Sequence, residues 1–404
     1  MTSKNSKLSI NLEHLNFYLL GISVFIGYYS IISSLDFFST QYNEPNLAFY
    51  FNIPSNLGII LTTLLIGYTK KFFSTKRMII FSLLLICIIT IFFPLLACLF
   101  PNKFGFWLFL ILNFIFSIIT TILQCHSFAL VSVFPDKCMA FLNAGQTSAG
   151  LLVTIIRIII LSIYDTNDQN YNFSMFFFYG VSFLIVVLTL LIYLKFEKET
   201  KLNFDPKIIY FTSENLIETE KNMAENTHSS YERKQNILDF WYAAKAMFPY
   251  SLLLFLVLVQ TTFCFPGMLL GYNKLNTNIA WNDILLILIM NFFDVFGNYS
   301  STLGYFSQKT ICTILVFSRF ILCFFLYLLF LDVISSGINN NYFCVVNLIL
   351  FAFSDGYLFS IILIKGPSIY TDQVEKETAE YSMVFLMNLG IIIGSTLSLV
   401  MLYI

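Results

Sequence analysis

Long apolar runs follow one another along the chain, each separated from the next by a shorter polar segment. A helix needs about 20 apolar residues to cross the hydrocarbon core of a membrane. The pattern therefore predicts an all-α polytopic membrane protein with about eleven membrane-spanning helices. The predicted spans cover approximately residues 16–38, 46–69, 78–100, 105–134, 138–163, 174–195, 245–271, 282–305, 310–334, 342–365 and 379–403.

One long polar segment interrupts this pattern. Residues 197–240 are rich in Glu, Lys and Asn and poor in apolar side chains, which predicts a flexible cytosolic loop. The loop separates an N-terminal six-helix bundle, residues 1–196, from a C-terminal five-helix bundle, residues 241–404. This 6+5 arrangement suggests a transporter plan built from two duplicated halves.

The composition supports the membrane assignment. Hydrophobic residues make up 58% of the chain and charged residues only 11%, whereas a soluble domain carries about 25% charged residues. The first apolar run is too long for a cleavable secretory signal, so we interpret it as the first span. A net charge of −1 argues against a nucleic-acid partner.

Cysteine and histidine give no sign of a metal or redox centre. None of the eight cysteines forms a CxxC pair, and the three histidines are far apart in the sequence. We therefore expect no metal and no other cofactor, and the sequence implies no obligate protein partner. A membrane enzyme or receptor is also disfavoured, because clustered His, Ser or carboxylate side chains are missing and the polar residues are evenly spread.

The distribution of basic residues predicts the orientation. If the N-terminus is cytoplasmic, the outer loops hold only about two basic residues, Lys103 and Lys274. Cytoplasmic loops carry the excess of Lys and Arg, so we expect a cytoplasmic N-terminus and an extracellular C-terminus, with the protein in the plasma membrane. The basic residues on the predicted inner side include Lys4, Lys7, Lys70, Lys71, Lys76, Arg77, Lys137, Lys309 and Lys376.

This orientation places one glycosylation sequon on the outer side. The sequence Asn172-Phe-Ser174 lies between the fifth and sixth spans, so we predict a glycan on Asn172. A second match, Asn298-Tyr-Ser300, lies within a predicted span, where we do not expect it to be used.

Polar side chains at membrane depth are the candidate functional residues. In the eighth span Asn291, Asp294 and Asn298 are spaced i, i+3 and i+7, so they share one helix face. We interpret this face as the wall of a hydrophilic cavity, because a carboxylate at that depth is costly; hydrogen bonding between helices is the alternative. Gln146 lies among small residues in the fifth span, which favours either ligand contact or close helix packing.

Two arginines also lie inside predicted spans. Arg157 in the fifth span and Arg319 in the ninth each need a counter-charge at membrane depth. The available carboxylates are Asp36, Asp294 and Asp355. We expect at least one structural Arg–Asp pair that holds helices in register, and the sequence leaves open which arginine meets which aspartate.

Four segments carry a resemblance to a known family. They are Phe134-Pro135 followed by Ala144–Gly150, Asn291-Phe-Phe-Asp294, Phe317-Ser-Arg-Phe320, and Phe351–Tyr357 followed by Pro367. In this order, they resemble the equilibrative nucleoside transporter family over most of the chain. The resemblance implies a major-facilitator-like fold that moves nucleosides or nucleobases by alternating access, and it implies that Gln146 and Asp294 contact the solute.

The chain departs from the family pattern at three places. Asn298 stands where the family usually has Arg, Asp355 stands where it usually has Asn, and Tyr28-Tyr29 stand where Trp-Asn is common. Without an arginine at Asn298, Asp294 is available to bind a proton or another cation, so transport is either facilitative or proton-coupled. Tyr28 still offers a face on which a solute can stack.

Together these observations favour a purine nucleoside or nucleobase transporter in the lipid bilayer. The alternative is a major-facilitator-type carrier of another small polar or cationic solute. The purine preference rests on an Asn-, Ile-, Phe- and Lys-rich composition that suggests an AT-rich genome, such as that of a parasite that scavenges purines. The candidate substrate-binding residues are Tyr28, Tyr29, Gln146, Asn291, Asp294 and Asn298.

Overall fold

The computed structural model describes residues 2–44, 46–69, 74–131, 134, 136–164, 171–200, 247–270, 279–301, 308–331, 339–366, 369 and 373–401. Nearly all of these residues are helical, and none of them lies in a strand. The helices are α1 (Thr2–Ile32), α2 (Leu35–Tyr42), α3 (Leu47–Tyr50), α4 (Asn52–Thr69), α5 (Thr75–Leu99), α6 (Lys103–Val131), α7 (Asp136–Ile163), α8 (Tyr171–Thr200), α11 (Phe248–Phe263), η1 (Cys264–Met268), α12 (Ile279–Ser301), α13 (Lys309–Phe330), α14 (Asn339–Lys365) and α15 (Gln373–Met401).

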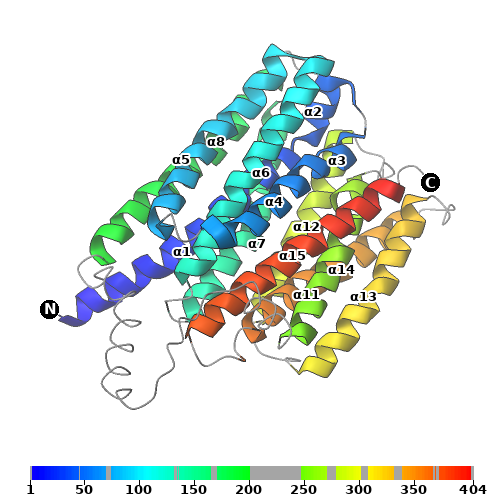
Figure 1. Ribbon diagram of the computed structural model, residues 1–404. Coiled ribbons are helices and arrows are strands. Elements are labelled where there is room, and N and C mark those ends of the chain that lie inside the picture. The colour runs from blue at the N-terminus through cyan, green and yellow to red at the C-terminus, as the bar shows by residue number, and fades with distance from the viewer. Residues whose placement is uncertain are drawn as a thin grey trace.

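The described part of the chain contains 11 helical segments that are long and apolar enough to cross a membrane. The predicted fold class and number of spans are therefore confirmed. The two long apolar runs at 105–134 and 138–163 form separate helices, α6 and α7. The start of α1 and the end of α15 lie at opposite ends of the molecule, as an odd number of spans requires (Figure 1).

Two spans differ from the prediction in their course. The sequence predicts a first span that runs to residue 38, but α1 ends at Ile32 and the short helix α2 follows after a turn. The predicted seventh span is interrupted between α11 and α12, where Phe265 adopts extended dihedral angles, φ −122° and ψ 137°. The following Pro266 disfavours a helical conformation at Phe265 and has no N–H to donate, which explains the interruption.

The predicted loop at 197–240 lies outside the described residues except at its start. There α8 continues to Thr200, beyond the predicted end of the first bundle at residue 196.

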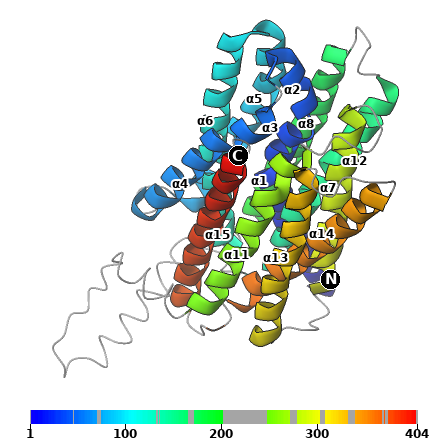
Figure 2. The same ribbon diagram turned by 90° about the vertical axis from the view of Figure 1, so that its right-hand side faces the viewer.

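The same pairs of helices pack together in each half of the chain. In the first half α1 packs against α7 and α4 against α6; in the second half α11 packs against α15 and α12 against α14. These are the first and fifth, and the second and fourth, spans of each half. The halves meet where α7 packs against α12 and α4 against α15 (Figures 1 and 2).

The outer surface of the helices is apolar. Large hydrophobic side chains, such as Leu64, Phe81, Leu184, Ile314 and Leu350, point outward and are about half exposed. The buried polar side chains lie between the helices instead. This arrangement, with apolar residues outward and polar residues inward, is the one that a lipid environment requires.

Backbone contact brings the helices that carry the candidate residues together. A Cβ atom on Gly145 of α7 would overlap the carbonyl oxygen of Tyr18 on α1. A Cβ atom on Gly356 of α14 would likewise overlap the carbonyl oxygen of Asp294 on α12. Glycine at these positions lets the helices approach as closely as small residues allow in membrane proteins, and it places Gln146 beside α1 and Asp355 beside Asp294.

Candidate functional site

A cavity of about 170 Å³ lies between the two halves of the molecule. Its wall is built by α1, α4, α6 and α7 from the first half and by α11, η1, α12, α14 and α15 from the second. A relative movement of the two halves would therefore change the shape of this cavity.

Four of the six candidate substrate-binding residues line this cavity. They are Tyr28 and Tyr29 on α1, Gln146 on α7 and Asp294 on α12. The glycine contact at Gly145 packs α1 against α7, and α12 packs against α7 from the other half of the chain.

Aromatic rings cover part of the cavity wall. The ring centroids of Tyr28 and Tyr29 lie 5.6 Å apart, and Tyr28 lies 5.9 Å from the ring of Phe51. Further rings on the wall belong to Phe25, Phe116, Phe265 and Phe359. Such rings offer flat faces on which a planar solute can stack.

Two carboxamides at the cavity wall have unused hydrogen-bonding atoms. Gln146 is 3% exposed, and neither its side-chain oxygen nor its nitrogen has a partner among the described residues. Gln124 on α6 is 5% exposed, and its Nε2 is also without a partner there. Buried polar atoms usually have hydrogen-bond partners. A bound solute would supply the partners that these two amides lack.

Gln124 was not among the residues that the sequence analysis selected. A pattern does reveal it: Ser117, Thr120, Thr121 and Gln124 are spaced i, i+3, i+4 and i+7, and all four line the cavity. This polar stripe on the fourth span is the same kind of signal as the polar face of the eighth span.

Asp294 is the carboxylate of the cavity wall that has no partner among the described residues. No hydrogen bond or ion pair to its carboxylate is found within the described ranges. The second carboxylate on the wall, Asp355, lies on the helix packed against α12 and is held by an arginine.

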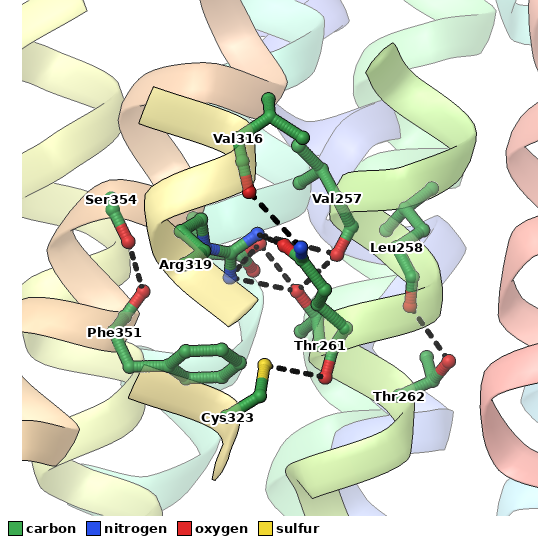
Figure 3. Close-up of polar contacts among 11 residues, drawn as sticks. Val257, Leu258, Thr261, Thr262, Val316, Arg319, Cys323, Phe351 and Ser354 are labelled. Carbon is green, nitrogen blue, oxygen red and sulfur yellow. Dashed lines mark hydrogen bonds and ion pairs between the residues drawn. The ribbon is translucent and has the colours of Figure 1, made fainter. Parts of the chain in front are cut away.

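Arg319 is enclosed by hydrogen-bond acceptors and by an aromatic ring (Figure 3). Its Nη2 lies 2.9 Å from Asp355 Oδ1 and donates to Thr261 Oγ1 at 3.1 Å. Thr261 in turn donates to the same Asp355 oxygen at 2.5 Å. The guanidinium also lies 4.5 Å from the centroid of Phe351. Arg319 is therefore used to neutralise Asp355 and joins α11, α13 and α14.

Gln260 completes this network on the side of α11. Its Oε1 accepts a hydrogen bond from Arg319 Nη1 at 3.4 Å, and its Nε2 donates to the carbonyl of Val316 at 3.0 Å. Both ends of its carboxamide are thus used between α11 and α13, unlike those of Gln146.

The second buried arginine lies in the first half. Arg157 Nη2 lies 2.7 Å from Asp36 Oδ2, and its Nε donates to the carbonyl of Ser33 at 3.0 Å. The structure thus pairs Arg157 with Asp36 and Arg319 with Asp355, with one pair in each half. The sequence had left open which arginine meets which aspartate.

Asn291 and Asn298 do not line the cavity. They bridge to the other half instead: Asn298 Nδ2 donates to Thr147 Oγ1 at 2.7 Å, and Asn291 Nδ2 donates to Thr154 Oγ1 at 3.0 Å. The polar face of α12 is therefore divided, with Asp294 turned to the cavity and the two asparagines to α7. Helix–helix hydrogen bonding, the alternative interpretation of this face, applies to these two residues.

A matching pair of bridges joins α4 and α15 at the other contact between the halves. Asn388 Nδ2 donates to Thr63 Oγ1 at 3.0 Å, and Asn56 donates to Ser395. In both places the bridging residues are one heptad apart on each helix, so they lie on the same helix face.

The described residues contain no group of three or more His, Cys, Asp or Glu side chains that would suit a metal ion. The sequon residue Asn172 is exposed at the start of α8, where its Oδ1 accepts a hydrogen bond from Gln41 Nε2 at 2.8 Å. The second match, at Asn298, is buried inside α12.

A sequence profile of the nucleoside transporter family matches residues 110–403, which is more than half of the chain. The chain belongs to the nucleoside transporter family. This confirms the resemblance to the equilibrative nucleoside transporters, and it identifies the protein as a membrane transporter. A comparison with curated protein sequences gave no match.

Solved structures show the fold of this nucleoside transporter family member. It is similar to a D-xylose–proton symporter, with a TM-score of 0.66 and 12% identity over 96% of this chain and 89% of that one. For XylE from E. coli the values are 0.65 and 13%, over 97% and 91%. For the E. coli fucose:proton symporter FucP they are 0.57 and 16%, over 98% and 91%. XylE is a major facilitator superfamily protein, so the predicted major-facilitator-like fold is confirmed.

Proposed function

We propose that this transporter moves purine nucleosides or nucleobases by alternating access, with the solute held in the cavity between its halves. The observation that carries the proposal is Gln146. Its carboxamide is buried at the cavity wall, and both of its polar atoms are unpaired among the described residues. The chain that carries it belongs to a family of nucleoside transporters. A carboxamide offers a donor beside an acceptor, the pair that matches the edge of adenine.

The other residues of the wall suit the remaining parts of such a solute. Tyr28 and Tyr29 provide ring faces for a base, and stacking on aromatic side chains tolerates different bases. The Asp294 carboxylate accepts hydrogen bonds from ribose hydroxyls or from base N–H groups. Gln124 adds a second amide from α6. Recognition is thus shared between the two halves, so the solute stabilises their closure around it.

Uptake of radiolabelled solutes into liposomes that contain the purified protein tests the proposal. Adenosine, inosine, adenine, hypoxanthine and uridine are compared with empty liposomes. We expect saturable uptake of the purine compounds and mutual competition among them. Failure of every nucleoside and base to enter, with correctly folded protein in the membrane, would refute the proposed function.

A second candidate is a carrier of another small polar solute. The structural neighbours FucP and XylE are proton symporters of fucose and xylose. Amide side chains that suit sugar hydroxyls, such as those of Asn52 and Asn113, line this cavity as well. Competition separates the candidates. A sugar carrier takes up labelled sugar even when nucleoside is in excess, whereas a nucleoside blocks that uptake only if both solutes bind in the same cavity.

A further inference from the structure

The charges of the cavity carry a further inference, which rests on the proposed function. Among the residues that line the cavity are two carboxylates, Asp294 and Asp355, and no Lys, Arg or His. The arginine nearest to them, Arg319, is 1% exposed and is bound to Asp355. The pair of Arg319 and Asp355 is neutral, so an ionised Asp294 leaves the cavity with one unbalanced negative charge.

The surroundings of Asp294 offer no cation to balance that charge. From α14 it faces Asp355 and from α1 it faces Tyr29. Tyr28 lies on the same cavity wall, and Arg319 lies behind Asp355. The helices α7 and α2, which also pack against α12, hold Arg157 and Asp36 respectively, and these two are paired with each other.

Asn298 lies one helical turn from Asp294, but it donates to Thr147 and carries no charge. The described surroundings of Asp294 therefore contain acids, phenols and amides, and both of their arginines are already paired.

Alternating access makes this charge costly. When both sides of the cavity are closed, water is excluded, and an unpaired ionised carboxylate in a dry site is strongly destabilised. The unpaired and buried carboxamide of Gln146 on the same cavity is an independent sign that a ligand completes this site. A ligand that also brings a positive charge would remove both costs at once.

We propose that the solute crosses together with one positive charge bound at Asp294. A proton from the solution is one source of this charge: it binds to a carboxylate oxygen on one side of the membrane and leaves it on the other. A cationic group of the solute itself is the other source. In either case the loaded cavity is neutral, and the empty cavity is anionic when it returns.

The experiment uses the purified full-length protein in liposomes. The first arm follows a neutral nucleoside, adenosine, with acid outside, equal pH or acid inside, and a pH-sensitive dye reports proton entry. If a proton is the source, adenosine accumulates toward the alkaline side, up to about tenfold per unit of pH difference for one proton per solute. Proton entry then starts when adenosine is added.

The second arm follows nicotinamide riboside, a permanently cationic nucleoside, at equal pH on both sides. If the solute is the source, this compound accumulates when the potential is negative inside, and adenosine uptake stays small. Asp294→Asn removes the response in whichever arm shows it. The matched control is Asp283→Asn, which removes a carboxylate on the same helix that does not line the cavity, and it keeps the response.

Two outcomes distinguish a failure of the charge proposal from a failure of the proposed function. Adenosine that equilibrates at the same concentration on both sides, without response to pH difference or potential, overturns the charge proposal and leaves the proposed function intact. Absence of all nucleoside and base uptake refutes the proposed function itself. If Asp294→Asn fails to fold, the wild-type dye signal still decides the first arm, because it needs no variant.

Discussion

At the scale of single residues, the pair of Arg319 and Asp355 is a structural element whose two members depend on each other. The carboxylate accepts from Arg319 at 2.9 Å and from Thr261 at 2.5 Å, while the arginine is 1% exposed. Removing one partner leaves a buried charge unpaired, which typically costs about 3–5 kcal/mol. We expect Arg319→Leu to lower the stability in detergent by about that amount.

The double variant tests this explanation. Replacement of a buried ion pair by apolar residues is often close to neutral, so Arg319→Leu combined with Asp355→Leu should regain most of the lost stability. Thermal unfolding followed by tryptophan fluorescence gives the comparison. Lys195→Ala is the control, because Lys195 and Glu199 form an exposed pair at 3.9 Å and its loss should cost less than about 1 kcal/mol. A double variant as unstable as the single one would contradict the pairing.

Gln146 gives a second prediction at this scale. Gln146→Leu keeps the size of the side chain and removes its donor and acceptor. A lost hydrogen bond to a buried partner costs about 1–3 kcal/mol, so uptake affinity for adenosine should fall about 5- to 150-fold. Inhibition curves of uptake give the affinity. Gln260→Leu is not a suitable control for affinity, because Gln260 holds Arg319, whereas Gln41→Leu, at the exposed contact with Asn172, should leave affinity unchanged.

At the scale of helices, amide–hydroxyl bridges join the two halves, and the proposed alternating access requires these contacts to open. Thr147 on α7 and Asn298 on α12 are joined at 2.7 Å. In a variant with Thr147→Cys and Asn298→Cys, an oxidant should form a disulfide that locks this contact. We expect transport to stop after oxidation and to return after reduction, as measured by adenosine uptake.

The control for the cross-link lies within one helix. Lys195→Cys with Glu199→Cys joins two exposed positions of α8, one turn apart. A link there does not connect the halves and should leave uptake intact. Uptake that continues in the oxidised α7–α12 variant would mean that this contact does not need to open.

The sequence predicts the individual helices well, but it does not predict how distant helices pack against each other. The spans follow from the length of apolar runs, because the thickness of the membrane fixes that length. The polar face of α12 follows from its spacing, but the division of that face between cavity and α7 does not, since it depends on how two distant helices pack. The pairing of Arg157 with Asp36 is hidden for the same reason: the two residues lie on separate helices, and only their packing brings them together.

At the scale of the whole molecule, the orientation in the membrane is still a prediction, and the distribution of basic residues is its basis. A cytoplasmic N-terminus puts the basic loops inside. Antibodies should detect a tag at the N-terminus of intact cells only after permeabilisation and a tag at the C-terminus without it. A glycosidase should change the mobility of the protein, and Asn172→Gln should abolish that change, whereas Ser300→Ala should not, because the sequon at Asn298 is buried in α12. Detection of both tags on the same side would contradict the eleven-span topology, and detection of the N-terminal tag alone on intact cells would contradict the orientation.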